Sequence, residues 1–258
     1  MDRLLSGKTA LVMGVANRWS IAYAIAKALH AHGAALALTY EGERTRDEVE
    51  KLGVELGDAH TTLCDVGKDE SIAALRASLE SKGIKLDALV HSLAFARKEE
   101  LGGKFYATTR DGFSLALDIS AYSLVALVRE LRPLLNPNAS VMAMTYLGSV
   151  RAVMNYNVMG VAKAALESVV RYLALDLGEE GGVRVNAISA GPIKTASARA
   201  VSGFTNIVGE VAKRSPLRRN VVAEDVGNVA TFLASDLSSG ISGQVLYVDA
   251  GYNIVGIV

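Results

Sequence analysis

The sequence predicts a doubly wound α/β fold, in which seven parallel strands form one sheet with helices on both faces. Short apolar runs rich in Val, Ile and Leu alternate along the chain with longer segments of helical period, as βαβ crossovers require. These runs are apolar on both faces, which is typical of a sheet covered on both sides. Half of the 258 residues are hydrophobic and only four are proline. We therefore expect a single domain over residues 1–258.

The elements follow one another in βαβ order. In chain order, the expected strands are Thr9–Met13, Ala35–Thr39, Thr61–Cys64, Leu86–His91, Ser140–Thr145, Val183–Ile188 and Val245–Val248. One irregular region follows the sixth strand: residues 194–222, which precede a helix starting near Ala223, carry a mixed helical pattern. Because loops at this place often close over an active site, we predict a substrate lid there.

Charge and hydropathy exclude two classes of partner. Lys plus Arg number 27 and Asp plus Glu number 27, so no global field attracts nucleic acid or an anionic membrane. The sequence Met1-Asp2-Arg3 leads into a strand without the apolar stretch of a signal peptide. No window is expected to approach the roughly 18 apolar residues of a membrane span. We therefore expect a soluble cytoplasmic protein.

The metal-ligating residue types show no metal pattern. Cys64 is the only cysteine, which excludes an intramolecular disulfide and a cysteine cluster. The four histidines, His30, His32, His60 and His91, lack ligand spacing. We therefore expect no metal site and no catalytic histidine.

The turn from Gly14 to Ile21 joins the first strand to the first helix. A dinucleotide pyrophosphate meets helix N–H groups at this position in Rossmann-type domains. Gly14 is the only glycine in the turn, so the G-x-G-x-x-G spacing fails, and Ser20 stands where a later glycine is usual. The hydroxyl of Ser20 can itself bind phosphate. The alternative is a plain strand-to-helix turn.

The end of the second strand indicates which nucleotide is bound. Glu41 lies about 20 residues beyond the turn, where a carboxylate accepts hydrogen bonds from ribose hydroxyls and repels a 2′-phosphate. This predicts NADH rather than NADPH. Arg44 and Arg46 follow closely, and either could reach a phosphate, so NADPH stays possible.

The third and fourth strands also end on polar or small residues. Asp65 and Val66 end the third strand, where the Asp65 carboxylate can meet the adenine amino group or, alternatively, cap the next helix. Ser92, Leu93 and Ala94 end the fourth strand and are expected beside the nicotinamide ribose. Ligands of open parallel sheets bind outside the carboxyl ends of the strands, so these strand ends together predict the cofactor site.

Tyr156 and Lys163 are the strongest catalytic candidates. Their spacing of seven brings the two side chains nearly into register on one helix face. A phenol there can donate a hydrogen bond to a developing oxyanion, while the ammonium holds a nucleotide. The alternative is an ordinary half-buried helix face.

With these residues in place, the chain resembles the short-chain dehydrogenase/reductase superfamily, and within it the bacterial enoyl-acyl-carrier-protein reductases. The resemblance covers nearly the whole chain and rests on the segments Leu5–Lys8, Asp118–Ser123, Tyr146–Gly148, Asn155–Gly160, Asn186–Ile193 and Val248–Gly251. Ordinary members carry a serine 13 residues before the tyrosine, whereas Ala143 stands here, near Thr145 and Tyr146. The enoyl reductases place a second tyrosine ten residues before the first, and Tyr146 fits that position.

This resemblance implies an activity and roles for the residues. It implies hydride transfer from NADH to the β-carbon of a trans-2-enoyl thioester, giving the saturated acyl-carrier-protein of type II fatty-acid elongation. Tyr156 would donate to the enolate oxygen, and Lys163 would hold the nicotinamide ribose. Tyr146 would position the thioester, deliver a proton, or form an aromatic wall. The further cofactor contacts it implies are Ile119, Ile193 and Thr195.

The resemblance also implies a substrate slot and partners. The apolar candidates for the slot under the lid are Ala96, Met159, Ala198, Val201, Phe204 and Ile207. An acidic acyl carrier protein would dock near the opening, where Lys194, Arg199, Lys213 and Arg214 supply positive charge. Relatives are commonly tetramers, so a homotetramer is expected.

Two other functions fit the same residues. A reductase of another carbonyl, such as a 3-ketoacyl thioester, would use the same Tyr156 and Lys163, but Ala143 and Tyr146 argue against it. A catalytically silent nucleotide-binding scaffold would keep the fold without turnover. The intact tyrosine and lysine disfavour that reading.

Overall fold

A seven-stranded parallel sheet forms the centre of the protein. The computed structural model describes residues 3–195, 198 and 203–256. The strands are β1 (Thr9–Met13), β2 (Ala35–Tyr40), β3 (His60–Leu63), β4 (Leu86–His91), β5 (Leu135–Thr145), β6 (Arg184–Ala190) and β7 (Val245–Val248). Their order in the sheet is β3-β2-β1-β4-β5-β6-β7. The predicted doubly wound α/β fold is confirmed.

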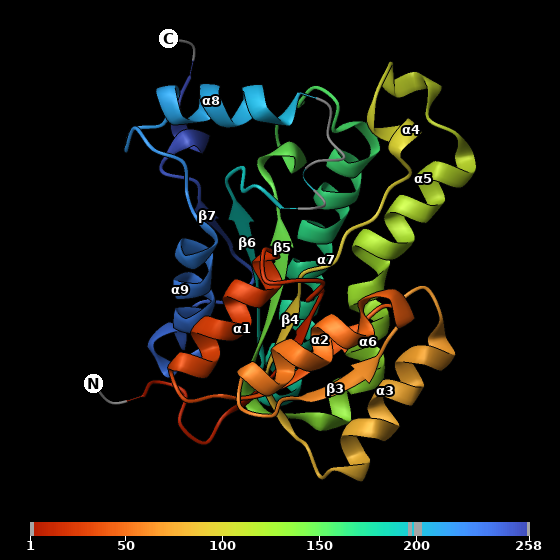
Figure 1. The fold of residues 1–258 in the computed structure, drawn as a ribbon, viewed down its shortest axis with the longest axis vertical. Helices are drawn as coiled ribbons and strands as arrows, with labels where there is room; N and C mark the ends of the chain where they lie inside the picture. Colours follow the sequence, from red (N-terminus) through yellow and green to blue (C-terminus); the bar gives the residue numbers. More distant parts are fainter. Residues whose placement is uncertain (1–2, 196–197, 199–202, 257–258) are drawn as a thin grey trace.

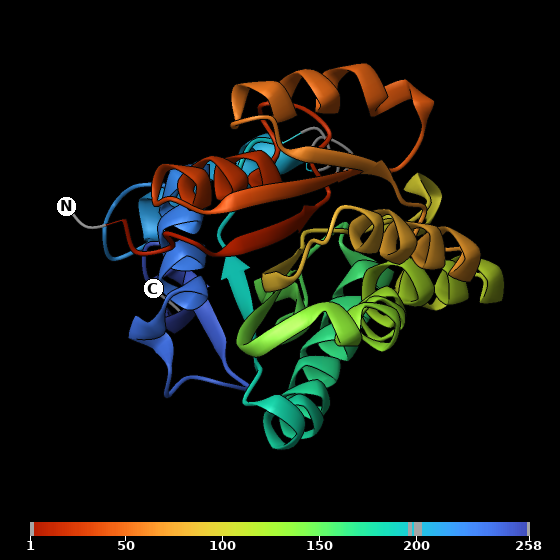
Figure 2. The same cartoon turned by 90° about the horizontal axis from the view of Figure 1, so that it is seen from below.

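The helices form a layer on each face of the sheet (Figures 1 and 2). One core cluster lies under α1 (Ile21–Ala31), α2 (Glu43–Glu55) and α9 (Ala223–Ala234). The other lies under α3 (Asp69–Ser81), α6 (Ser123–Leu131) and α7 (Asn157–Gly181). Because helices bury both faces of the sheet, its strands appear in the sequence as continuous apolar runs.

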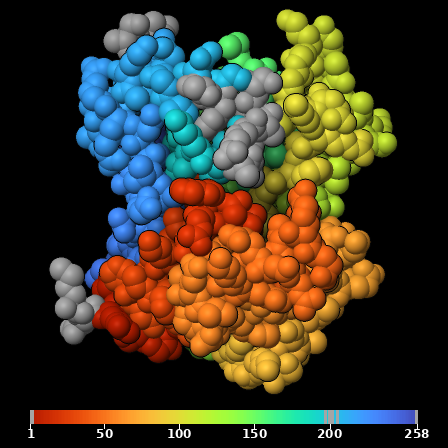
Figure 3. Space-filling model, viewed as in Figure 1, coloured from red at the N-terminus to blue at the C-terminus, as the bar shows by residue number. Residues whose placement is uncertain are grey.

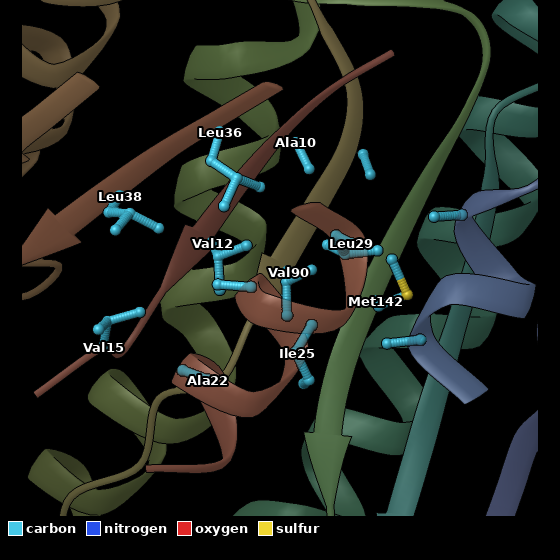
Figure 4. Packing of buried hydrophobic residues seen from close by; sticks show 14 of the residues in the cluster. Ala10, Val12, Val15, Ala22, Ile25, Leu29, Leu36, Leu38, Val90 and Met142 are labelled. Atoms are coloured by element: carbon cyan, nitrogen blue, oxygen red, sulfur yellow. The ribbon is translucent and has the colours of Figure 1, made fainter. Parts of the chain in front are cut away.

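The core beneath α1 shows how closely the two layers pack. Figure 4 shows Val12 of β1 and Val90 of β4 facing Ile25 of α1. All three side chains are fully buried. Burial of such a side chain contributes about 1.5–3 kcal/mol each relative to exposure, so this packing fixes α1 firmly above the sheet.

Three strands are longer than expected, and the smallest difference is in β2, which continues one residue to Tyr40. The first residues of β5 include Asn136, Pro137 and Asn138, a polar stretch that hides a strand from an apolar pattern. The pairing of β4 with β5 also shifts register between Leu86 and Ala88. β6 continues to Ala190, two residues beyond the expected end.

Shorter elements stand beyond the carboxyl ends of the strands. They are α4 (Lys98–Leu101), α5 (Arg110–Leu117) and α8 (Phe204–Arg214), the last of which lies in the expected lid segment. Figures 1 and 3 show α8 and the α4–α5 segment rising on opposite sides of the same end of the molecule. This end is where the predicted site residues lie.

One helical stretch among the described residues is long and apolar enough to cross a membrane by length and composition alone. The helical stretch Arg110–Leu134, which joins α5 to α6 through a π-helical turn, has a mean hydropathy of 1.4 over its most apolar window. Half of that window is buried within the protein. Its side chains Leu124, Leu127 and Leu131 belong to the core shared with α3 and α7. The apolar composition of this stretch therefore serves packing against the sheet.

Candidate active site

The carboxyl ends of β1 and β4 meet at the point where the strand order reverses. β1 pairs with β2 on one side and β4 on the other, so the crevice of a doubly wound sheet lies here. Gly14 has φ +90°, and a Cβ added to it would lie 2.1 Å from the carbonyl oxygen of Ser92. Only glycine fits this close approach. The two predicted cofactor segments are thus in contact.

The Ser20 hydroxyl stabilises the turn between β1 and α1. Its Oγ donates to the Asn17 carbonyl oxygen at 2.8 Å and accepts from the Tyr23 N–H at 3.1 Å, which caps α1. The hydroxyl therefore shapes the turn and the helix N-terminus. Its predicted contact with phosphate stays a prediction.

Glu41 follows β2 and is exposed. Of the two arginines that could oppose it, Arg46 is paired with Glu50 at 2.8 Å and Glu43 at 3.4 Å. Arg44 has no recorded hydrogen bond or ion pair within the described part of the chain. Arg44 is therefore the less engaged of the two arginines, and its contact with a 2′-phosphate stays a prediction.

Asp65 does not cap a helix. The N-cap of α3 is Lys68, so the alternative assignment of Asp65 is wrong. Its carboxylate accepts from the Gly67 N–H at 3.1 Å and pairs with Lys68 at 2.9 Å. The bond from Lys68 holds the pKa of Asp65 below its usual value, so it is an acceptor at neutral pH.

Several predicted cofactor residues pack their side chains into the two cores. Ile21 and Ile193 pack on the cluster under α1, whereas Val66 and Leu93 pack on the cluster under α7. Their polar atoms at the sheet edge are those of the backbone. Ala94 is exposed beside them.

Lys163 joins the ends of β4 and β5. Its Nζ donates to the Met144 carbonyl oxygen at 2.8 Å and to the Leu93 carbonyl oxygen at 3.3 Å. The side chain is buried, and burial lowers its pKa to about 8 against the opposing effect of Glu167. Two of its three N–H groups are engaged, so one can reach a ligand at this edge.

Tyr156 and Tyr146 lie side by side. Tyr156 directly precedes α7, and the two ring centroids are 5.0 Å apart with an interplanar angle of 69°. Such edge-to-face packing orients both rings. Burial is the main cause that raises the pKa of each phenol, so both are neutral hydrogen-bond donors at neutral pH.

The π-helical turn Asp118–Tyr122 fixes the segment after β4. The Ser120 hydroxyl accepts from the Phe95 N–H at 3.0 Å and donates to the Phe95 carbonyl oxygen at 3.2 Å. Ile119, predicted to contact the cofactor, lies in the same turn against Gly67. A π-helical turn at such a place is common near functional sites.

His91, at the end of β4, is fully buried and was expected to have no role. The Ser123 hydroxyl donates to the Ile119 carbonyl oxygen at 2.7 Å and therefore accepts from Nε2 of His91 at 2.8 Å. Burial and the charge of Lys163 lower the pKa of His91 to about 3, so the ring is neutral. Among the described residues no group of three or more His, Cys, Asp and Glu side chains could hold a metal ion.

An apolar cluster lies beside Tyr156. Met159 packs with Leu101 and Ala162, and Ala96, Leu117 and Tyr156 lie against them. The structure thus brings together three of the residues predicted to bind the substrate, Ala96, Met159 and Tyr156. Leu101, Leu117 and Ala162 were missed, although Ala162 stands three residues after Met159 on the same helix face.

Of the remaining slot candidates, the described residues Ala198 and Ile207 are not part of that cluster. The Thr195 hydroxyl oxygen accepts from the Ala198 N–H at 3.1 Å, and Ile207 is half-buried in α8. Val201 and the side chain of Phe204 lie outside the described residues.

Comparison with known proteins gives one consistent result. Residues 14–253 match the family model described as enoyl-(acyl carrier protein) reductase. The chain is 49% identical over 251 residues to the enoyl-[acyl-carrier-protein] reductase [NADH] FabI of Salmonella typhimurium, covering 97% of this chain and 95% of that protein. It is 48% identical to the corresponding [NADPH] enzyme of Staphylococcus aureus, covering 97% and 98%. The crystal structure of the Aquifex aeolicus NADH enzyme superposes with a TM-score of 0.96 at 47% identity, covering 99% and 100% of the two chains.

Proposed function

Because this chain belongs to the enoyl-(acyl carrier protein) reductase family, we propose that it reduces trans-2-enoyl thioesters of acyl carrier protein to saturated acyl thioesters with NADH. This is the last reductive step of type II fatty-acid elongation. The observation that carries the proposal is the pair of neutral, half-buried phenols of Tyr156 and Tyr146 near the strand ends joined by Lys163. The apolar cluster of Met159 beside them offers a place for the acyl chain.

Tyr156 is the proposed oxyanion donor. NADH, when bound, would supply the hydride that adds to the β-carbon of the substrate. Negative charge would then develop on the thioester oxygen, to which the Tyr156 hydroxyl donates a hydrogen bond, and the α-carbon would take a proton from water to complete the saturated thioester. An oxyanion donor of this kind is worth about 2.7–4 kcal/mol in the transition state. The raised pKa of the phenol keeps its proton in place until the charge appears.

Tyr146 and Lys163 are proposed to support that donor. Tyr146 packs edge-on against the Tyr156 ring and is proposed to position the thioester carbonyl. Lys163, with its remaining N–H group, is proposed to bind the hydroxyls of the nicotinamide ribose. Loss of either support would misplace reacting groups that must lie within about 3–3.5 Å of each other.

The cofactor cradle fits a dinucleotide. Gly14, with φ +90°, lies against the Ser92 backbone at the end of β1. The exposed carboxylate of Glu41 follows the end of the neighbouring strand β2. Glu41 is proposed to bind the adenine ribose, with Asp65 beside the adenine, and to favour NADH. Relatives carry both cofactor names, [NADH] and [NADPH]. Arg44 is the residue through which NADPH would bind here.

The assembly proposed for this enzyme is a cytoplasmic homotetramer that receives its substrate from acyl carrier protein. The outer face of α7 carries Tyr172 and Leu175, which are 70% and 58% exposed, and Met154 just before the helix is 84% exposed. Large exposed apolar side chains on this helix and just before it support the proposal that another chain covers this surface. Light scattering coupled to size exclusion would measure the mass directly.

A steady-state assay tests the activity, the cofactor and the donor together. Crotonyl thioester is offered with NADH and NADPH in parallel to the wild-type protein and to Tyr156→Phe. We expect rapid NADH oxidation by the wild type, weaker use of NADPH, and a loss of about 10²–10³ in kcat for the variant.

Two other outcomes would change the assignment. Consumption of a 3-ketoacyl thioester in place of the crotonyl thioester would indicate a carbonyl reductase. Ala143, fully buried on β5, puts no hydroxyl at the position that such enzymes use. NADH binding without turnover of either thioester would indicate a silent scaffold.

A further inference from the structure

Glu167 is a buried acidic residue on α7 that the mechanism above does not use. It stands one helical turn beyond Lys163, and the two residues are 5% and 4% exposed. An ionised carboxylate so deep in a protein is costly unless other groups compensate it. It makes no direct ion pair with Lys163 among the described contacts, but it lies one helical turn from that buried ammonium and raises its pKa.

The carboxylate of Glu167 is tied to the same strand end as Lys163. The Thr145 hydroxyl donates to its Oε1 at 2.7 Å, and Thr145 directly follows Met144, whose carbonyl oxygen accepts from Lys163. Successive residues of β5 are thus bonded to successive turns of α7. Tyr146 is the next residue of the chain.

We propose that Glu167 is a positioning residue that acts through Lys163: its buried carboxylate, anchored on Thr145 one helical turn away, keeps charged the Lys163 ammonium that the Met144 and Leu93 carbonyl groups hold at the ends of β4 and β5. This inference rests on the proposed function, in which that ammonium holds the nicotinamide ribose. Removing the carboxylate would leave a buried cation without a compensating charge.

The other titratable groups around this pair do not supply that charge. His91 on β4 is neutral, and Tyr156 and Tyr146 keep their protons at neutral pH. On β7, Tyr247 has its pKa raised by burial, then by Glu167 and Asp249. Within residues 3–195, 198 and 203–256, Glu167 is the carboxylate found to raise the pKa of Lys163 against the effect of burial.

The sign of the expected effect follows from these charges. Burial places the pKa of Lys163 at about 8, so the ammonium begins to lose its proton just above neutral pH. Without the negative charge of Glu167 the proton is lost at a lower pH. NADH affinity should then weaken at a pH where the wild type still binds.

The test is the pH dependence of NADH affinity and of kcat/KM in Glu167→Gln, from pH 6 to 10. The matched control is Glu179→Gln, the same change at an exposed position of the same helix. We expect the alkaline limb of Glu167→Gln to move down by about one pH unit. The control should retain the wild-type limb. NADH affinity is measured by fluorescence without substrate.

Thr145→Val tests the anchor separately, because it removes the hydroxyl and leaves the carboxylate. We expect a smaller shift in the same direction. If Glu167→Gln does not fold, the shift in Thr145→Val decides the question.

Two results would overturn the proposal. One is an alkaline limb in Glu167→Gln that coincides with that of the control. The other, should Glu167→Gln not fold, is an unshifted limb in Thr145→Val. If the wild type binds NADH but fails to reduce enoyl thioesters, the proposed function falls, while the NADH affinity series still tests Glu167.

Discussion

Substituting Gly148 by alanine should displace the ring of Tyr156. Gly148 lies in the short 3-10 turn Leu147–Ser149 after β5. A Cβ built there is 2.5 Å from Cδ1 and 2.7 Å from Cε1 of Tyr156. Carbon atoms pack at about 3.5 Å or more, so the ring must move by about 1 Å.

The surroundings of Tyr156 make that displacement costly. The Tyr146 ring packs against it with a centroid separation of 5.0 Å, so the ring cannot move freely. Overpacking in such a place destabilises by about 1–3 kcal/mol, which a domain of this size tolerates. A misplacement of 1 Å at a reacting group costs about 10² in rate. We therefore expect Gly148→Ala to fold, bind NADH and lose about 10² in kcat.

The assay combines crotonyl thioester reduction with NADH titration and urea unfolding. The control is Gly178→Ala, where an added Cβ meets no atom within 4 Å and the residue lies inside α7. That variant should keep full activity and gain up to about 1 kcal/mol in the free energy of unfolding. Wild-type kcat and wild-type stability in Gly148→Ala would refute the argument from steric overlap.

Three further predictions concern residues outside the reacting centre. Asn157 has φ +31° and donates to the Gly102 carbonyl oxygen at 2.9 Å. Both Asn157→Ala and Asn157→Gly lose that bond, but only glycine adopts this φ without strain, so the alanine variant should be less stable in urea by about 1 kcal/mol. Equal stabilities of the two variants would contradict this. His91 is neutral in the folded protein with a pKa of about 3, while in the unfolded chain it protonates near 6.5. Because the unfolded state then binds the extra proton, the contribution of His91 to stability is complete above about pH 6.5 and falls by about 1.4 kcal/mol per unit below it. His91→Gln should show a shallower loss of stability from pH 6 to 4, and parallel curves would exclude this role. Cys64 is buried with a pKa raised to about 12, so iodoacetamide should alkylate it rapidly only after unfolding, and fast labelling of the native protein would show that it is accessible.

The sheet and its order of elements could be predicted from the sequence because each strand is buried on both faces. Continuous apolar runs such as Thr9–Met13 and Val245–Val248 begin and end where expected. The start of β5 could not be predicted, because Asn136 and Pro137 lie in the irregularity between Leu135 and Ser140, the two residues that pair with β4 on either side of it. Tertiary pairing overrides local propensity at such a place.

The gathering of the candidate residues at one edge of the sheet could be predicted in part, because it depends on local features of the sequence. Strand ends and the Tyr156–Lys163 spacing are local features, and the structure brings them to one edge. The partners of these groups are not local: the Thr145 hydroxyl reaches Glu167 across 22 positions, and Ser123 reaches His91 across 32. The spacing of four between Lys163 and Glu167 was the one signal that could have revealed the buried acid.

The place of β1 between β2 and β4 has a consequence for how the chain is made. Residues 1–85 emerge from the ribosome before β4, so one edge of β1 waits without its partner strand while β2 and β3 are already available. An unpaired apolar edge of this kind is prone to aggregate. The cradle formed by Gly14 and Ser92 also does not exist until β4 has joined the sheet. In a nascent chain stalled before residue 86 this edge of β1 is therefore open to aggregation, and nucleotide binding at the cradle cannot yet protect it.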